Sequence, residues 1–287
     1  MKIEKINLDG KKDSIEVLDK LKHVSDRNDY VLSWWDYGYL TRYYADVKTL
    51  SDGGKHSGST LFPSSFTFLN PQEEASKMLR LDAEYTEKRI EKGDEMTQLH
   101  NTNIGSMILE YGYNSATEFL SNINRIDELP LKTRDIFVYL PSVMIDILTT
   151  VDKFSNFNLD TGVEKRPPVF FVAKSYTENS KKIQFAENIY IDKKNDTIQL
   201  GKHTLPMKRF VITSYDSNKN LSKRVIPINS SAQISVIFMK DYNKFVILDE
   251  RMYHSLYIQL FVLENNDKNL FEPVILTPSA KVYKLKI

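Results

Sequence analysis

Three neighbouring side chains, Trp34, Trp35 and Asp36, carry the most distinctive chemistry in this sequence. The two tryptophans are the only ones in the chain. An indole N–H can only donate a hydrogen bond, whereas an ionised carboxylate can only accept one. A ligand hydroxyl, which donates once and accepts at two lone pairs, satisfies both kinds of group. These residue types are therefore compatible with a pocket built for a hydroxyl.

The same segment also permits a plain structural interpretation. If the chain from Val31 to Tyr37 is extended, successive side chains point to opposite faces, so both indoles cannot enter one core. One tryptophan would then pack in the core, and Asp36 would start a turn at Gly38. Against this interpretation, aliphatic side chains would fill a core equally well and have no polar atoms that need partners. The chemistry of the residues leaves both interpretations open.

A family resemblance favours the hydroxyl pocket. The five residues from Trp34 to Gly38 resemble the WWDYG signature of the catalytic subunits of oligosaccharyltransferases, which N-glycosylate asparagine in Asn-X-Ser/Thr sequons. The segments that follow are similar to that family in their order: Tyr39, then Thr49-Leu50-Ser51-Asp52-Gly53-Gly54, then an acidic helix from Pro71.

Residues 52–59 contain three glycines, which predicts a plain surface turn, with a mobile loop beside a binding site as the alternative.

A second element agrees with the resemblance. Residues 135–140 predict a short buried strand, and Pro141-Ser142 can start a helix after it. On pattern alone this is a core-facing helix. Bacterial members of the family carry an MxxI element on a helix near the WWDYG strand, and Met144-Ile145-Asp146-Ile147 matches it. Val151 follows at the spacing expected for one more residue on the same face.

The resemblance implies a role for each of these side chains. Trp34 and Trp35 would donate to the hydroxyl of a threonine at the +2 position of a sequon, and Asp36 would accept its proton. Ile147 would cover the threonine methyl group, and Met144 would shape the same wall. Burying one methyl is worth about 0.8 kcal/mol, so threonine should bind roughly fourfold better than serine. The residues expected to support this acceptor-peptide site are Tyr37, Gly38 and Val151.

The chain as a whole predicts an α+β protein in two parts. Residues 1–165 form a mainly helical core that carries the WWDYG strand and the MxxI helix, with further helices predicted over 71–91, 102–111 and 116–125. Residues 166–287 are β-rich and indicate an antiparallel, barrel-like sheet. In the family a β-rich insertion lies within the helical core.

Two further expectations concern the C-terminal part. Residues 249–260 predict a helix after the β-rich segments. The last strand, residues 280–287, is expected to return to the first part of the chain.

Composition excludes several classes of function. The 39 basic and 38 acidic side chains give a net charge of +1, which offers no electrostatic case for nucleic acid. The absence of cysteine excludes disulfides, thiol catalysis and cysteine-based zinc sites. No apolar stretch approaches 18 residues, so the chain as given is expected to be soluble. The histidines lie far apart and are expected to face solvent or to make single polar contacts: His23, His56, His100, His203 and His254.

The resemblance also implies a cellular setting. The family's enzymes carry a large transmembrane half ahead of their WWDYG domain, so this chain resembles the C-terminal globular part of a bacterial single-subunit oligosaccharyltransferase at the periplasmic face of the inner membrane. The whole enzyme would transfer a glycan from a polyprenyl diphosphate to an acceptor protein. Its catalytic carboxylates and its Mg²⁺ or Mn²⁺ would lie outside this chain, which is expected to be monomeric and inactive alone.

A rival function comes from a different class of protein. A periplasmic or extracellular carbohydrate-binding module would use the two tryptophans to stack on sugar. Stacking needs exposed, coplanar ring faces, whereas hydroxyl capture needs the indole N–H groups turned towards one point.

Overall fold

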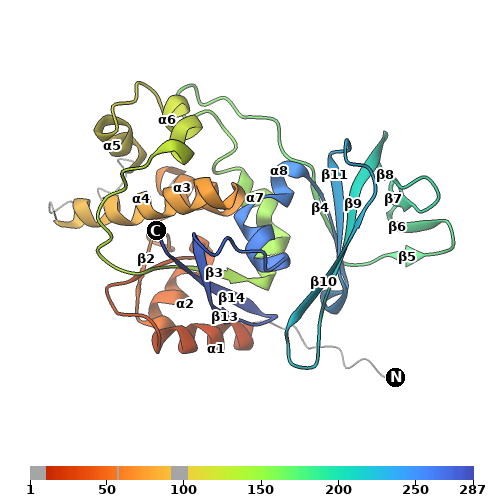
Figure 1. The fold of residues 1–287 in the computed structure, drawn as a ribbon, viewed down its shortest axis with the longest axis horizontal. Helices are drawn as coiled ribbons and strands as arrows, with labels where there is room; N and C mark the ends of the chain where they lie inside the picture. The colour runs from red at the N-terminus through yellow and green to blue at the C-terminus, as the bar shows by residue number, and fades with distance from the viewer. Residues whose placement is uncertain (1–10, 57, 92–102) are drawn as a thin grey trace. The chain divides into compact units, whose positions relative to one another are not determined.

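The computed structural model describes residues 11–56, 58–91 and 103–287. The chain divides into two compact units. One unit, here called the helical unit, contains residues 9–167 together with residues 255–261 and 265–287. The other, here called the strand unit, contains residues 168–254 and 262–264. Figure 1 shows the elements of both. His100, one of the five histidines, lies outside the described part of the chain.

A five-stranded mixed sheet lies in the helical unit, in the order β13-β14-β3-β1-β2. Its strands are β1 (Tyr30–Leu32), β2 (Lys48–Thr49), β3 (Ile136–Pro141), β13 (Phe271–Leu276) and β14 (Ala280–Leu285). β1 is parallel to both β2 and β3, with Leu32 opposite Val138. β14 is antiparallel to β3 and to β13. The last strand, β14, thus returns to the first part of the chain as predicted, and β13 also belongs to this sheet.

The helices of the helical unit follow in sequence order. They are α1 (Lys11–Lys22), α2 (Trp35–Ala45), α3 (Gly58–Leu69), α4 (Gln72–Glu91), α5 (Asn103–Glu110), α6 (Ala116–Asn122) and α7 (Leu148–Asp152), with 3₁₀ turns η1 (Ile123–Arg125) and η2 (Ser142–Ile147). The sequence did not predict α3, which contains Pro63. Because α3 buries Leu61, Phe62 and Phe68, it lacks the polar face by which a surface helix is recognised.

The C-terminal part of the chain departs from the predicted helix over 249–260. The structure instead has a short α8 (Glu250–Tyr253) and a π-helix, η4 (Ile258–Val262). Asp249 starts α8 by accepting a hydrogen bond from the Met252 N–H at 3.0 Å. The N–H of Leu256 then donates to the carbonyl of Asn70 at 2.8 Å. α8 therefore ends before residue 256, because that N–H is engaged outside the helix, and a new helical segment begins there.

The strand unit contains a nine-stranded sheet, in the order β4-β12-β11-β9-β8-β7-β6-β5, with β10 paired to β9. The strands are β4 (Phe170–Ala173), β5 (Thr177–Glu178), β6 (Lys182–Ala186), β7 (Ile189–Asp192), β8 (Thr197–Leu200), β9 (His203–Tyr215), β10 (Leu221–Pro227), β11 (Ile234–Met239) and β12 (Lys244–Asp249). The predicted antiparallel arrangement fails at one pair, since β11 is parallel to β9. β10 runs back along β9, and a second reversal after Pro227 restores the direction of β9.

Glu87 of α4 holds three parts of the helical unit together. Its Oε1 accepts a hydrogen bond from the Tyr30 hydroxyl at 2.6 Å and from Lys48 Nζ at 2.7 Å, and it lies 3.0 Å from Arg134 Nη1. Burial alone would raise the pKa of Glu87, but the hydrogen bonds from Lys48 and Tyr30 and the charge of Arg134 lower it. The carboxylate is therefore ionised where it ties β1 and β2 to α4.

We expect Glu87→Gln to destabilise the chain by about 3 kcal/mol, because the change removes the charge that compensates the partly buried Lys48 and Arg134. The pKa of Glu87 is lower in the folded state than in the unfolded state, so its ionisation stabilises the fold at pH values above the ordinary carboxylate pKa. This stabilisation is lost as the pH falls through the folded-state pKa. Urea unfolding at neutral and acidic pH measures both effects. Glu91→Gln, on the exposed end of α4, should change neither. Equal losses of stability at both pH values would contradict the ionic role.

Candidate functional site

Three chain segments leave the five-stranded sheet at the same edge. β1, β2 and β3 are parallel neighbours, so their carboxyl ends meet at one edge. The WWDYG segment follows β1, residues 50–55 follow β2, and η2 with the MxxI residues follows β3. Ligands of open α/β sheets bind outside the carboxyl ends of their parallel strands. The two motifs singled out in the sequence thus start from adjacent strands.

The WWDYG segment opens a helix, so its predicted placement on a strand is wrong. β1 ends at Leu32, Trp34 is still extended (φ −64°, ψ 144°), and α2 begins at Trp35. The Tyr37 N–H donates to the Trp34 carbonyl at 2.9 Å and closes the first turn. Asp36 lies in that first turn, where the helix dipole favours a carboxylate.

The two indole rings have different surroundings. Trp34 is only 1% exposed and meets the ring of Phe154 edge-on, with centroids 5.4 Å apart. Trp35 is half-buried and stacks on the imidazole of His56, with centroids 5.1 Å apart. Because Trp34 has no open face, the pair forms no platform for stacking on sugar. The convergence of both N–H groups on one hydroxyl stays a prediction.

Charges from both motifs affect the pKa of Tyr37. Partial desolvation raises the pKa of the exposed Asp36 carboxyl. Burial, with the negative charges of Asp36 and Asp146, raises the pKa of Tyr37 to about 12. The charge of Asp146, on η2, thus acts on the Tyr37 hydroxyl of α2. The Tyr37 ring also meets Tyr139 of β3, with centroids 6.5 Å apart. Residues from both motifs therefore share one neighbourhood.

Gly38 lets α2 approach the segment that follows β2. A Cβ at this position would lie 2.4 Å from the Cβ of Asp52 and 2.5 Å from the carbonyl oxygen of Ser51. The Ser51 hydroxyl in turn donates to the carbonyl of Ser33 at 2.8 Å, immediately before the tryptophans. Only glycine permits this approach without displacing backbone atoms. The WWDYG glycine is thus a packing residue.

The predicted surface turn at residues 52–59 is wrong for its first residue. Asp52 is buried, at 1% exposure, and accepts hydrogen bonds from Thr49 Oγ1 at 3.0 Å, from Arg42 Nη1 at 3.2 Å and from the Gly54 N–H at 2.8 Å. Burial acts to raise the pKa of Asp52, but these donors and the charge of Lys55 lower it. The sequence signal for this role is an acidic residue directly before two glycines.

The MxxI residues lie on the 3₁₀ turn η2, and not on the predicted α-helix. A 3₁₀ helix has about 3 residues per turn, so Met144 and Ile147 lie on the same side. Met144 and Val151 are buried at 0% exposure, whereas Ile147 is half-buried. Of these three side chains only Ile147 has surface for a ligand. The Ser65 hydroxyl of α3 donates to the Val151 carbonyl at 2.6 Å and anchors α7.

Two further properties of the described residues bear on function. Among them, no three side chains of the kinds that bind metal ions come together. None of the helices in residues 11–56, 58–91 and 103–287 has both the length and the apolar character needed to cross a membrane.

Comparisons with known proteins agree with the fold and the motifs. The family model described as "STT3/PglB/AglB core domain" matches residues 27–161, and the model described as "STT3/PglB C-terminal beta-barrel domain" matches residues 169–248. A crystal structure of the C-terminal domain of PglB from C. jejuni covers 96% of this chain and 100% of its own chain, with a TM-score of 0.82 and 33% identity. The chain belongs to the STT3/PglB family, as the WWDYG resemblance predicted.

Curated relatives give the family's activity by name. Two proteins named undecaprenyl-diphosphooligosaccharide–protein glycotransferase, from Campylobacter jejuni subsp. jejuni serotype O:2 and from Campylobacter jejuni strain RM1221, are each 37% identical to this chain over 278 residues. These matches cover 94% of this chain but only 38% of each relative.

Proposed function

We propose that this chain recognises the acceptor sequon for an oligosaccharyltransferase, which transfers a glycan from a polyprenyl diphosphate to asparagine. One observation carries the proposal: the WWDYG and MxxI segments leave the carboxyl ends of the adjacent parallel strands β1 and β3. Two segments so placed can contact one extended peptide. The names of the curated relatives support the class of reaction.

In this proposal the +2 hydroxyl of the sequon supplies the specificity. The indole N–H groups of Trp34 and Trp35 donate to the hydroxyl oxygen, and Asp36 accepts its proton. A +2 valine has the same shape as threonine but leaves these three polar groups without partners, which costs several kcal/mol. The partly exposed Ile147 covers the threonine methyl group.

The transfer chemistry belongs to the rest of the whole enzyme in this proposal. An asparagine amide nitrogen is a poor nucleophile, so the reaction needs groups that activate it. We infer that the metal, the catalytic carboxylates and the lipid-linked oligosaccharide are held by a membrane-anchored part. This chain would lie at the periplasmic face of the inner membrane, act as a monomer and bind no nucleic acid. It holds the sequon in position for attack.

The isolated chain is therefore expected to show no transferase activity. Incubation with lipid-linked oligosaccharide, Mn²⁺ and a threonine sequon peptide, followed by mass spectrometry of the peptide, checks this expectation. The whole enzyme serves as the positive control in the same assay. Turnover by the isolated chain would contradict the assignment of the reacting groups to the membrane-anchored part.

Replacing Ile147 with alanine in the whole enzyme should narrow the preference for threonine over serine from about fourfold to nearly none, because the threonine methyl loses its cover. The measurement is kcat/KM for two peptides that differ only at +2. Val143→Ala is the matched control, since Val143 lies on the same 3₁₀ turn and is 42% exposed. An unchanged preference in Ile147→Ala would exclude Ile147 from the methyl contact.

A further inference from the structure

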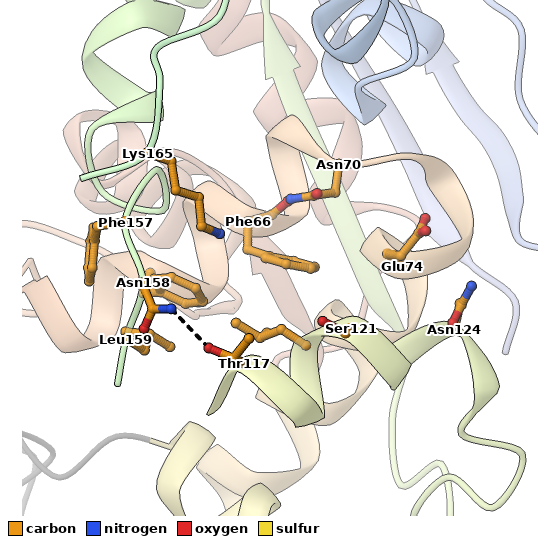
Figure 2. A pocket seen from close by; sticks show the side chains of 12 residues that line it. Phe66, Asn70, Glu74, Thr117, Ser121, Asn124, Phe157, Asn158, Leu159 and Lys165 are labelled. Atoms are coloured by element: carbon orange, nitrogen blue, oxygen red, sulfur yellow. Dashed lines mark hydrogen bonds between the residues drawn. The ribbon is translucent and has the colours of Figure 1, made fainter. Parts of the chain in front are cut away.

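A cavity lies within the helical unit, built from residues outside both motifs. Its volume is about 300 Å³, at the lower end of the range for small-molecule sites. Side chains from α3, α4, α6 and the segment after α7 line it (Figure 2). Phe62, Phe66 and Phe157 form its aromatic part, and the rings of Phe62 and Phe157 meet edge-on with centroids 5.7 Å apart.

Two opposite charges lie in this cavity without pairing to each other. The Glu74 Oε2 atom is buried, and among the described residues it has no hydrogen-bond partner. A buried carboxylate oxygen without a donor is costly in a folded protein. Figure 2 shows the Lys165 ammonium and the Glu74 carboxylate on either side of Phe66. The cavity thus offers an acceptor-only group and a donor-only group to one ligand.

Uncharged polar side chains complete the lining. Asn70 donates to the Phe66 carbonyl at 2.8 Å through its amide nitrogen, which leaves its amide oxygen as an acceptor. Asn124 and Ser121 also face the cavity. At the rim, Thr117 and Asn158 are already bonded to each other at 3.1 Å. The lining therefore combines aromatic rings with several separate donors and acceptors.

We propose that this cavity binds one pyranose ring of a glycan. Each ring hydroxyl both donates and accepts, so a sugar can bond to Glu74, Lys165 and the amides at once. The C–H face of a pyranose packs against aromatic side chains, which present large apolar faces. The charges of Glu74 and Lys165 sum to zero, which suits a neutral ligand and disfavours a phosphate beside Glu74. This site is independent of the sequon site, because it uses none of the same residues.

The test uses the 287-residue chain and saturation-transfer NMR with methyl glycosides of glucose, galactose, N-acetylglucosamine and N-acetylgalactosamine. A single ring should bind at least one of these with a Kd of about 1–10 mM. Glu74→Gln and Lys165→Met should each raise that Kd at least fivefold. Glu73→Gln and Lys153→Met, at exposed positions outside the cavity lining, should leave it unchanged. Circular dichroism verifies that each variant is folded.

Several outcomes would overturn the proposal. These are the absence of saturable binding of any glycoside, equal binding by Glu74→Gln, Lys165→Met and their controls, and tighter binding of a zwitterionic amino acid such as serine. A glycopeptide and a free oligosaccharide that end in the best-bound ring then distinguish protein-attached from unattached glycan as the source. None of these results depends on transferase activity, so failure here leaves the sequon proposal intact, and the reverse also holds.

Discussion

Asp36→Ala in the whole enzyme is expected to lower kcat/KM for a threonine sequon peptide by about 100-fold. The change removes the only carboxylate of the WWD triplet, and with it the acceptor for the proton of the +2 hydroxyl. A hydrogen bond to a charged group is worth about 1.5–3 kcal/mol, which spans roughly 10-fold to 150-fold in binding. Peptide binding by fluorescence anisotropy and initial rates of glycosylation measure the loss.

Two controls separate this role from a structural one. Asp19→Ala changes an exposed carboxylate on α1 and should leave kcat/KM unchanged. The pH profile gives an independent readout, because partial desolvation raises the pKa of Asp36. Peptide affinity should fall as the pH is lowered through this raised pKa, and Asp36→Ala should lose that dependence. Activity of Asp36→Ala within threefold of wild type would exclude Asp36 from sequon recognition.

Gly38→Ala is expected to destabilise the helical unit by about 3 kcal/mol, the upper end of the usual cost of overpacking. The added Cβ would lie 2.5 Å from the Asp52 Cα and the Ser51 carbonyl oxygen, which are backbone atoms and cannot rotate away. α2 must therefore move away from the segment after β2, and Trp35 and Asp36 move with it. Thermal unfolding of the 287-residue chain measures the effect.

Gly54→Ala is the matched control for this change. The atoms nearest to a Cβ at Gly54 are Asp52 Oδ1 and the Tyr39 hydroxyl, both at 3.3 Å, so a displacement of only a few tenths of an ångström relieves the contact. Its cost should be clearly smaller than that of Gly38→Ala. A Gly38→Ala chain that unfolds at the wild-type temperature would show that the close approach of α2 to Asp52 is not required.

Local sequence patterns were sufficient wherever an element depends on its own residues. The helix over 72–91 was predictable because its apolar residues, among them Met78 and Leu79, recur at helical spacing, although charged residues between them such as Asp82 and Glu84 are buried as well. β3 was predictable as a continuous apolar stretch, which is typical of a strand buried on both faces. By contrast, α3 was missed, since a helix that is apolar on most sides shows no period.

The sequence by itself determined the family, through five consecutive residues of rare composition, and the hydrogen-bonding chemistry of Trp34, Trp35 and Asp36. Only the tertiary structure decided that α2 starts at Trp35, that Trp34 is buried against Phe154, and that Met144 is buried while Ile147 is partly exposed. The physical reason is that these features depend on contacts between distant segments. Pairing of β1 with β3 and the fit of Gly38 against Asp52 place the two motifs together, and neither contact leaves a local periodic signal.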